Sequence, residues 1–220
     1  MKFIKKILFA IIIIIIIFLS VITLKGYSMY KTAIDKIPLE DKIASLEKDK
    51  DYAYYKELPT DYVNAVIAIE DHRFKEHHGI DYISLGRAIV RNINEFSFVE
   101  GGSTITQQVA KNLYFSQEKT IIRKIAELFV VHDLEKNYEK EKILELYVNT
   151  NYFGSGYYGV KEAAKGYFDK SLNEIDFNEC LLLAGIPNAP SVYSLDANPE
   201  LAMQRATQVL NAMKEHGYVD

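Results

Sequence analysis

The sequence contains no tryptophan and one cysteine among its 220 residues. A single thiol cannot form an intrachain disulfide, and the three leucines that follow Cys180 predict a buried thiol rather than a nucleophile. A basic tract is also missing. Lys2, Lys5, Lys6 and Lys25 flank an apolar N-terminal segment, which leaves 22 basic against 30 acidic residues in the rest of the chain. This acidic body argues against nucleic acid as the main partner.

The N-terminal segment is the one long hydrophobic run. From Ile7 to Leu24 there are 18 residues without a charge, seven of them consecutive isoleucines. At about 1.5 Å per residue, the run approaches the roughly 30 Å of a hydrocarbon core. A signal peptide is the alternative, but its apolar region is usually about 7–15 residues long, and Gly26-Tyr27-Ser28 is a poor cleavage site. We therefore expect an uncleaved anchor, with the N-terminus cytoplasmic because most of the flanking lysines precede the run.

The remainder of the chain has helical periodicity, no run of alternating strands and no internal repeat, so a mainly α fold is predicted. We expect residues 1–25 to form the anchor, 26–57 a polar juxtamembrane connector with one short helix, and 58–220 one globular domain. A hydrophobic content of 49% is sufficient for its core.

Several helices have sequence signals for their ends or faces. Thr60 or Asp61 can begin one, and Thr104 with Gln107 fits a capping box for another. A helix opening at Asp81 should carry Ile83, Leu85, Ile89 and Ile93 on one face. A longer helix over about residues 120–136 should bury Ile121, Ile122, Ile125, Leu128 and Phe129.

Titratable residues crowd into the segment from Glu70 to Gly79, directly after an apolar helix. A glutamate held there at the rim of a cleft could act as a general base. Composition alone favours an ordinary charged helix end. The possible metal ligands Asp71, His72, His77 and His78 match no familiar metal spacing.

Gly101 and Gly102 lead into the next helix, whose free N–H groups would favour an anion. Lys111 could add a positive charge, but a plain glycine hinge remains an alternative, and the ending of a Walker loop is absent. Arg123, Lys124 and Glu127 can share one helix face, for which an exposed ion-paired surface is the simplest interpretation. Taken together, the three segments indicate a site for glycosyl or phosphoryl transfer.

Four motifs occur in order. Residues 70–79 fit E-D-x-x-F-x-x-H-x-G, residues 101–112 fit G-G-S-T-I-T-Q-Q-x-x-K-N, and residues 123–127 fit R-K-x-x-E. Residues 142–145, K-I-L-E, are followed by Tyr147 and Asn149 in a fourth motif. Over roughly residues 58–215 the chain therefore resembles the peptidoglycan glycosyltransferase domain of class A penicillin-binding proteins and monofunctional transglycosylases.

The resemblance implies a lysozyme-like, mainly α fold with a large lobe and a smaller lobe next to the membrane. It implies that lipid II is added to a lipid-linked glycan, with Glu70 as the base and Glu127 acting at the departing pyrophosphate. A divalent cation, Mg²⁺ or Mn²⁺, is expected to assist, and no organic cofactor. The expected substrate-binding residues are Asp71, Phe74, His77, Ser103, Thr104, Gln107, Gln108, Lys111, Asn112, Lys119, Arg123 and Lys124.

The same resemblance implies a single-pass protein of the bacterial plasma membrane whose catalytic domain faces outward. Its expected partners are the bilayer and cell-wall synthesis proteins, including a separate transpeptidase. Ser116 and Ser171 begin chance matches to transpeptidase motifs without the third motif, so the chain is expected to be monofunctional. Phe96, Phe98 and Val99 could dip into the membrane interface or belong to the core.

Two departures from the family pattern are visible: Lys119 replaces a common arginine and Asp169 a common glycine. Two rival functions remain open. One is a glycan-cleaving enzyme of the lysozyme or lytic transglycosylase type, in which one glutamate is a general acid. The other is a catalytically silent scaffold, against which the presence of both Glu70 and Glu127 counts.

Overall fold

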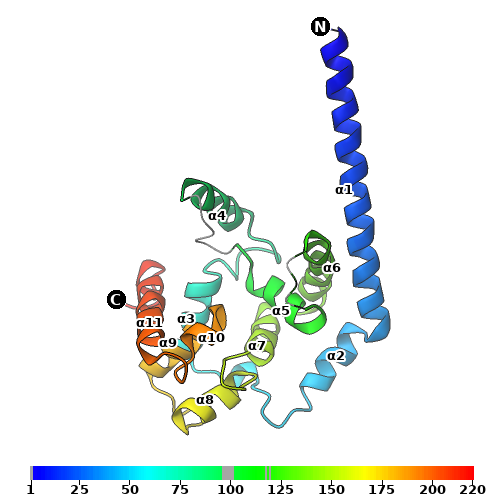
Figure 1. Ribbon diagram of the computed structural model, residues 1–220. Coiled ribbons are helices and arrows are strands. Elements are labelled where there is room, and N and C mark those ends of the chain that lie inside the picture. Colours follow the sequence, from blue (N-terminus) through cyan, green and yellow to red (C-terminus); the bar gives the residue numbers. More distant parts are fainter. Residues whose placement is uncertain (1, 96–101, 117, 119) are drawn as a thin grey trace.

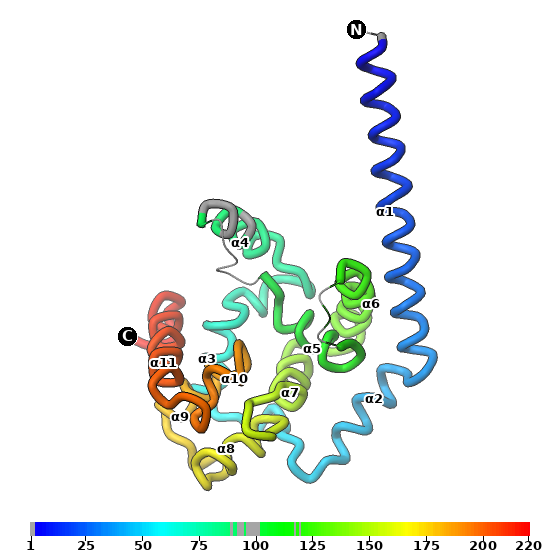
Figure 2. Tube along the Cα trace, viewed as in Figure 1, coloured from blue at the N-terminus to red at the C-terminus, as the bar shows by residue number. Residues whose placement is uncertain are grey.

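The computed structural model describes residues 2–95, 102–116, 118 and 120–220, and the remaining residues are drawn in grey in Figure 2. Within these ranges the chain forms eleven α-helices, two short 3₁₀ helices and no strand beyond an isolated bridge between Tyr152 and Tyr158. The predicted mainly α fold behind one N-terminal apolar helix is confirmed. Phe96, Phe98, Val99 and Lys119 fall outside the described residues.

The first helix, α1 (Lys2–Lys36), projects away from the rest of the molecule for most of its length (Figure 1). It is long and apolar enough to cross a membrane, and none of its most apolar stretch is buried in the domain. The helix does not end at residue 25, where we expected the connector to begin, but continues for three more turns.

This continuation packs against α6 (Ile121–Asn137). A Cβ atom on Gly26 would lie only 2.5 Å from the Ile125 side chain, so glycine permits the close approach of the two helices. The rings of Tyr27 and Tyr30 contact Phe129 at centroid distances of 5.3 and 5.4 Å. The anchor helix is therefore docked on the domain rather than tethered by a loose connector.

The rest of the connector contains α2 (Leu39–Leu46) and a 3₁₀ turn, η1 (Tyr55–Glu57), and it lies against α7 (Lys140–Thr150). The Asn149 side chain accepts from the backbone N–H of Ala53 at 2.7 Å and donates to its carbonyl at 2.8 Å. Glu145 accepts from the Tyr52 hydroxyl at 2.6 Å. These residues of the fourth motif therefore fasten the connector to the domain.

The core of the domain consists of two packed groups of helices. In the first, α3 (Thr60–Glu70) packs against α9 (Phe177–Gly185) and α11 (Pro199–Glu215). In the second, α5 (Ile105–Tyr114) packs between α6 and α7. Smaller elements complete the fold: α4 (Tyr82–Asn94), α8 (Val160–Phe168), η2 (Ile186–Asn188) and α10 (Pro190–Tyr193).

The ends of three helices can be compared with what the sequence predicted. The Thr104–Gln107 capping box begins α5 as expected. By contrast, α3 begins after Pro59 without a side-chain cap, so neither Thr60 nor Asp61 is its N-cap. Asp169 ends α8 with a φ of +55°, in the left-handed region that favours glycine, the residue expected there from the family pattern.

The predicted buried face of α6 was wrong. Ile121 is 65% exposed and Leu128 is 38% exposed, whereas Arg123 and Glu127 are buried. The apolar stripe is turned toward α1 and the surface because the opposite face of α6 packs on α5. The Asp81 carboxylate accepts hydrogen bonds from backbone N–H groups in the first turn of α4. On the predicted apolar face of α4, Ile83 and Leu85 are exposed to solvent.

Candidate active site

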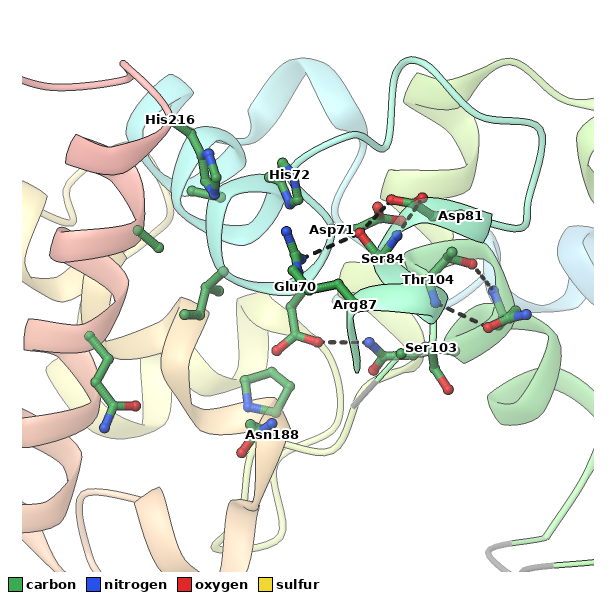
Figure 3. A pocket seen from close by; sticks show the side chains of 18 of the residues that line it. Glu70, Asp71, His72, Asp81, Ser84, Arg87, Ser103, Thr104, Asn188 and His216 are labelled. Carbon is green, nitrogen blue, oxygen red and sulfur yellow. Dashed lines mark hydrogen bonds between the residues drawn. The ribbon is translucent and has the colours of Figure 1, made fainter. Parts of the chain in front are cut away.

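A cavity of about 820 Å³ opens between the C-terminal end of α3, the N-terminal end of α5, α4 and α11. Figure 3 shows Glu70 between Asn188 and the Ser103–Thr104 segment, with His72 and His216 farther along the same cavity. It is a long polar cleft whose walls come from helices that are distant in sequence.

Glu70 is the last residue of α3, so its carboxylate leaves the apolar helix and enters the cavity. Its side chain is only 8% exposed. Gln108 of α5 donates to Oε2 at 2.7 Å, and the nearest cation, Arg205 Nη2, lies 3.9 Å from Oε1. Burial raises the pKa of Glu70, and Gln108 and Arg205 oppose that rise. These are the surroundings of a carboxylate that can exchange a proton.

The segment after Glu70 is held in place through the side chain of Asp71. The buried Asp71 carboxylate lies 2.9 Å from His77 Nε2 and accepts from the backbone N–H of Ile105 at 3.0 Å. The Thr104 hydroxyl donates to the carbonyl of Gly79 at 2.7 Å, which joins the far end of the same segment to α5. The first two motifs therefore fix the position of Glu70 relative to α5.

On the other side of the cavity, the wall includes two lysines, Lys124 of α6 and Lys111 from the last turn of α5. Lys124 Nζ donates to Ser103 Oγ at 3.2 Å, and Lys111 lines the same wall. Burial, Arg123 and Lys111 lower the pKa of Lys124 to about 8, and burial and Arg123 lower that of Lys111. Positive groups are thus gathered here in a partly desolvated space, which favours the binding of a phosphate.

Glu127 lies behind these lysines and does not line the cavity. It is fully buried, its Oε1 pairs with Arg123, and its Oε2 lies 2.9 Å from Lys124 Nζ. Arg123 also donates to the carbonyl of Glu118. The prediction of an exposed ion-paired surface was therefore wrong, because this face of α6 is turned inward.

The structure brings most of the predicted site residues together. Eight of them line the cavity: Glu70, Asp71, Ser103, Thr104, Gln107, Gln108, Lys111 and Lys124. Arg123 and Glu127 stand behind Lys124. Three others are absent from the cavity wall: Phe74 is in the core, His77 is bound to Asp71, and Asn112 donates to Asn151 at 2.8 Å. Their roles in this structure are to position the motifs.

The α11 side of the cavity contains residues that the sequence analysis did not select. They are Arg205, Gln208, Glu215 and His216, to which η2 and α10 add Pro187, Asn188 and Tyr193. The rings of His72 and His216 are stacked at a centroid distance of 4.2 Å. A weak signal existed, because Arg205, Gln208 and Glu215 are spaced by three and seven positions and so share one face of the helix.

The residues described provide no group of three or more histidine, cysteine, aspartate or glutamate side chains that could hold a metal ion. Glu70, Asp71 and Glu127 are separately engaged by Gln108, His77 and Arg123. A protein-only metal site therefore does not fit these side chains. The site they do form has a proton acceptor on one side and a cluster of cations on the other.

Comparison with known proteins identifies the sequence family of the chain. Residues 39–214 match the sequence family described as Transglycosylase. Penicillin-binding protein 1F of Bacillus subtilis is 43% identical over 180 residues, 81% of this chain and 25% of that protein. Penicillin-binding protein 1A of Aquifex aeolicus is 44% identical over 168 residues, 76% of this chain and 23% of that protein.

A shorter relative matches along most of its length. A Cupriavidus necator protein named "putative transglycosylase" is 42% identical over 184 residues, 84% of this chain and 79% of that protein. The chain thus spans about a quarter of the two penicillin-binding proteins and about four-fifths of this one.

Proposed function

The chain belongs to the transglycosylase family, and we propose that it is a peptidoglycan glycosyltransferase that polymerises lipid II into a β-1,4 glycan with release of undecaprenyl pyrophosphate. The observation that carries this proposal is the pairing of a nearly buried Glu70 with a cationic wall across one cavity. A sugar nucleophile must lose a proton while a pyrophosphate leaves with added negative charge. The two sides of the cavity suit these two demands.

Glu70 would act on the acceptor. Its ionised carboxylate takes the proton of the acceptor 4-hydroxyl, and the oxygen attacks the anomeric carbon of the donor sugar. The bond from that carbon to the pyrophosphate oxygen breaks with its electron pair on the oxygen. Because the acceptor oxygen enters from the face opposite the leaving pyrophosphate, the configuration inverts. Gln108 fixes Glu70 Oε2 through a neutral donor, which orients the base without neutralising it.

Lys111 of α5 and Lys124 of α6 would act on the donor, because both line the cavity. Their charges and the Ser103 hydroxyl can stabilise the developing charge on the leaving pyrophosphate. Arg123 and Glu127 would act indirectly, by fixing α6 and the position of Lys124. A divalent cation remains a prediction. Since the described residues offer no three-ligand group, such an ion would depend on the oxygens of the substrate's phosphates.

The long apolar helix suits a substrate that stays in a membrane. Tyr82, Ile83 and Val90 of α4 are 74%, 68% and 59% exposed. The helix α4 itself lies on the side of the domain toward which α1 projects (Figure 1). We propose that both elements contact the outer leaflet of the plasma membrane, with the cavity outside the cell. A separate transpeptidase would then crosslink the product, and the chain itself should not bind penicillin covalently.

Glycan cleavage is the second candidate, because a glutamate with a raised pKa can also act as a general acid. Hydrolases usually need a second carboxylate across the cleft. Glu127 is ion-paired and absent from the cavity wall, so it is poorly placed for that role. Incubation with purified cell wall distinguishes the two functions, since only a cleaving enzyme would release soluble fragments.

The direct test uses the full chain with lipid II and a divalent cation, and it separates products by size. We expect a ladder of lipid-linked glycan from the wild type and none from Glu70→Gln. Glu76→Gln is the matched control, because it makes the same change at an exposed carboxylate of the same segment. A ladder from Glu70→Gln as strong as that of the control would refute Glu70 as the base. Intact lipid II with every protein would instead favour the scaffold.

A further inference from the structure

We propose that Arg205 is a positioning residue that keeps the Glu70 carboxylate ionised, acting on the base rather than on the substrate. The inference rests on the proposed function, because it concerns the same base. Arg205 belongs to α11, which lies outside the four motifs that led to the site. It would make the last helix of the domain part of the catalytic machinery.

The geometry of the pair gives each carboxylate oxygen a different neighbour. Gln108 donates to Oε2, whereas Oε1 is buried without a hydrogen bond and faces Arg205 Nη2 at 3.9 Å. This distance is too long for a hydrogen bond but short for a charge interaction. The Arg205 side chain is 13% exposed, so water screens the interaction weakly. The guanidinium can thus stabilise the charge while leaving Oε1 free to accept a proton.

Among the groups that face Glu70, Arg205 is the strongest candidate for this role. Tyr62 of α3 and Tyr147 of α7 are fully buried, and the charge of Glu70 raises the pKa of each tyrosine. The neighbouring Asp71 raises the pKa of Glu70 itself. Lys111 is the other cation, but it lies at the proposed phosphate wall. In the described part of the chain, no other cation lies within ion-pair distance of Glu70.

The fold holds Arg205 in place from several sides. A Cβ atom on Gly185 of α9 would lie 2.8 Å from Arg205 Cγ, so glycine leaves room for the stem of the side chain. Nη1 donates to Gln208 at 2.9 Å, and the guanidinium carbon lies 5.8 Å from the centre of the Tyr193 ring. Glu70 is the only carboxylate in the described residues within ion-pair distance of Arg205. The charge is therefore directed at the base.

The test is a pH profile of kcat and KM for lipid II with the full chain. Removing the charge in Arg205→Gln should move the acid limb of kcat up by about one to three pH units. Since each unit is about a tenfold change in the ionised fraction below the pKa, the variant should lose activity mainly at low pH and recover as the pH rises. Arg205→Lys keeps the charge and should keep most of the limb. Lys214→Gln removes an exposed charge from the same helix and should change nothing.

Each result decides the question. A shifted acid limb with little change in KM supports the proposal. An unshifted limb overturns it, whether kcat is unchanged, kcat falls equally at every pH or only KM rises. If Arg205→Gln does not fold, Gly185→Ala replaces it, because the added methyl group should displace the Arg205 stem and shift the limb in the same direction.

A second measurement separates this proposal from the proposed function. Infrared difference titration of the Glu70 carboxyl, identified by its absence in Glu70→Gln, reads protonation without any substrate. If the wild type makes no glycan, the proposed function fails, but the titration still decides the role of Arg205. The protonated carboxyl band should persist to higher pH in Arg205→Gln than in the wild type. An identical titration would overturn the proposal.

Discussion

Glu70 and Glu127 are both carboxylates withdrawn from water, yet their partners differ. Glu70 ends a helix at a cavity and has one neutral donor and one cation at 3.9 Å. Glu127 lies in the middle of α6, fully buried, with Arg123 on one oxygen and Lys124 2.9 Å from the other. A carboxylate that is fully paired cannot readily accept a proton, whereas one that is desolvated and incompletely paired can. The contrast supports the proposal that Glu70 transfers the proton and that Glu127 positions the cations.

The largest expected effect comes from Glu70→Gln, which should lower the rate of glycan formation by about 10²- to 10⁴-fold. The same change should raise stability at neutral pH. Burial raises the folded-state pKa of Glu70, so this carboxyl favours folding below its unfolded pKa and loses that contribution as pH rises through the folded pKa. Glutamine has no charge to desolvate, so we expect a gain on the order of 1 kcal/mol in unfolding free energy.

Thermal unfolding at two pH values checks this sign. At neutral pH the gain corresponds to a rise of roughly 2–4 °C in Tm. Below about pH 4 the wild-type carboxyl is protonated in both states, and the two proteins should unfold together. A lower Tm for Glu70→Gln at neutral pH would show that the charge of Glu70 stabilises the fold, and the contrast with Glu127 would then disappear.

Glu127→Gln should have the opposite effect on stability. It leaves the buried Arg123 without its counter-charge, and breaking a buried pair from one side costs about 3–5 kcal/mol. Unfolding by denaturant measures the loss. The double variant with Arg123→Met removes both charges and should be less destabilised than Glu127→Gln alone. Additive losses would mean that the pair is not coupled, and that Glu127 has another role.

The sequence predicted the surroundings of Glu70 better than those of Glu127. It placed Glu70 at the end of an apolar helix and Thr104 at a capping box, because both signals are local. It also placed Arg123 and Glu127 on one face of a helix. The burial of this face was not predicted, because the apolar residues on the opposite side of the helix were expected to face the core.

What the sequence could not predict depends on contacts between distant segments. Arg205 reaches Glu70 only because α11 packs on α3, and nothing near Arg205 in the sequence indicates that neighbour. The continuation of α1 beyond residue 25 has the same cause. Its polar composition suggested a connector, whereas Gly26 and Tyr30 find their partners, Ile125 and Asp133, on α6.

A smaller effect is expected at Lys124, which pairs with Glu127 and also lines the cavity that Glu70 enters. Its pKa is lowered to about 8, so in the free enzyme its charge is lost as pH rises through that value. The basic limb of kcat/KM for lipid II should therefore lie near pH 8. Lys124→Arg should move this limb upward, because arginine stays charged. Lys124→Gln should lower kcat/KM roughly tenfold at neutral pH. Lys48→Arg, at an exposed position, is the control.

The smallest effect concerns Glu145, another buried carboxylate, which has hydrogen-bond partners but does not line the cavity. It accepts from the Tyr52 hydroxyl at 2.6 Å and the Tyr55 N–H at 2.8 Å, and it pairs with Lys142. Glu145→Gln should lower the unfolding free energy by about 1 kcal/mol, measured against Glu141→Gln at an exposed position of the same helix. Below the unfolding temperature, kcat should be unchanged, because burial and pairing without access to the cavity give a carboxylate a structural role only. A fall in kcat with unaltered stability would show that the connector reaches the reaction, and that the cavity does not contain the whole active site.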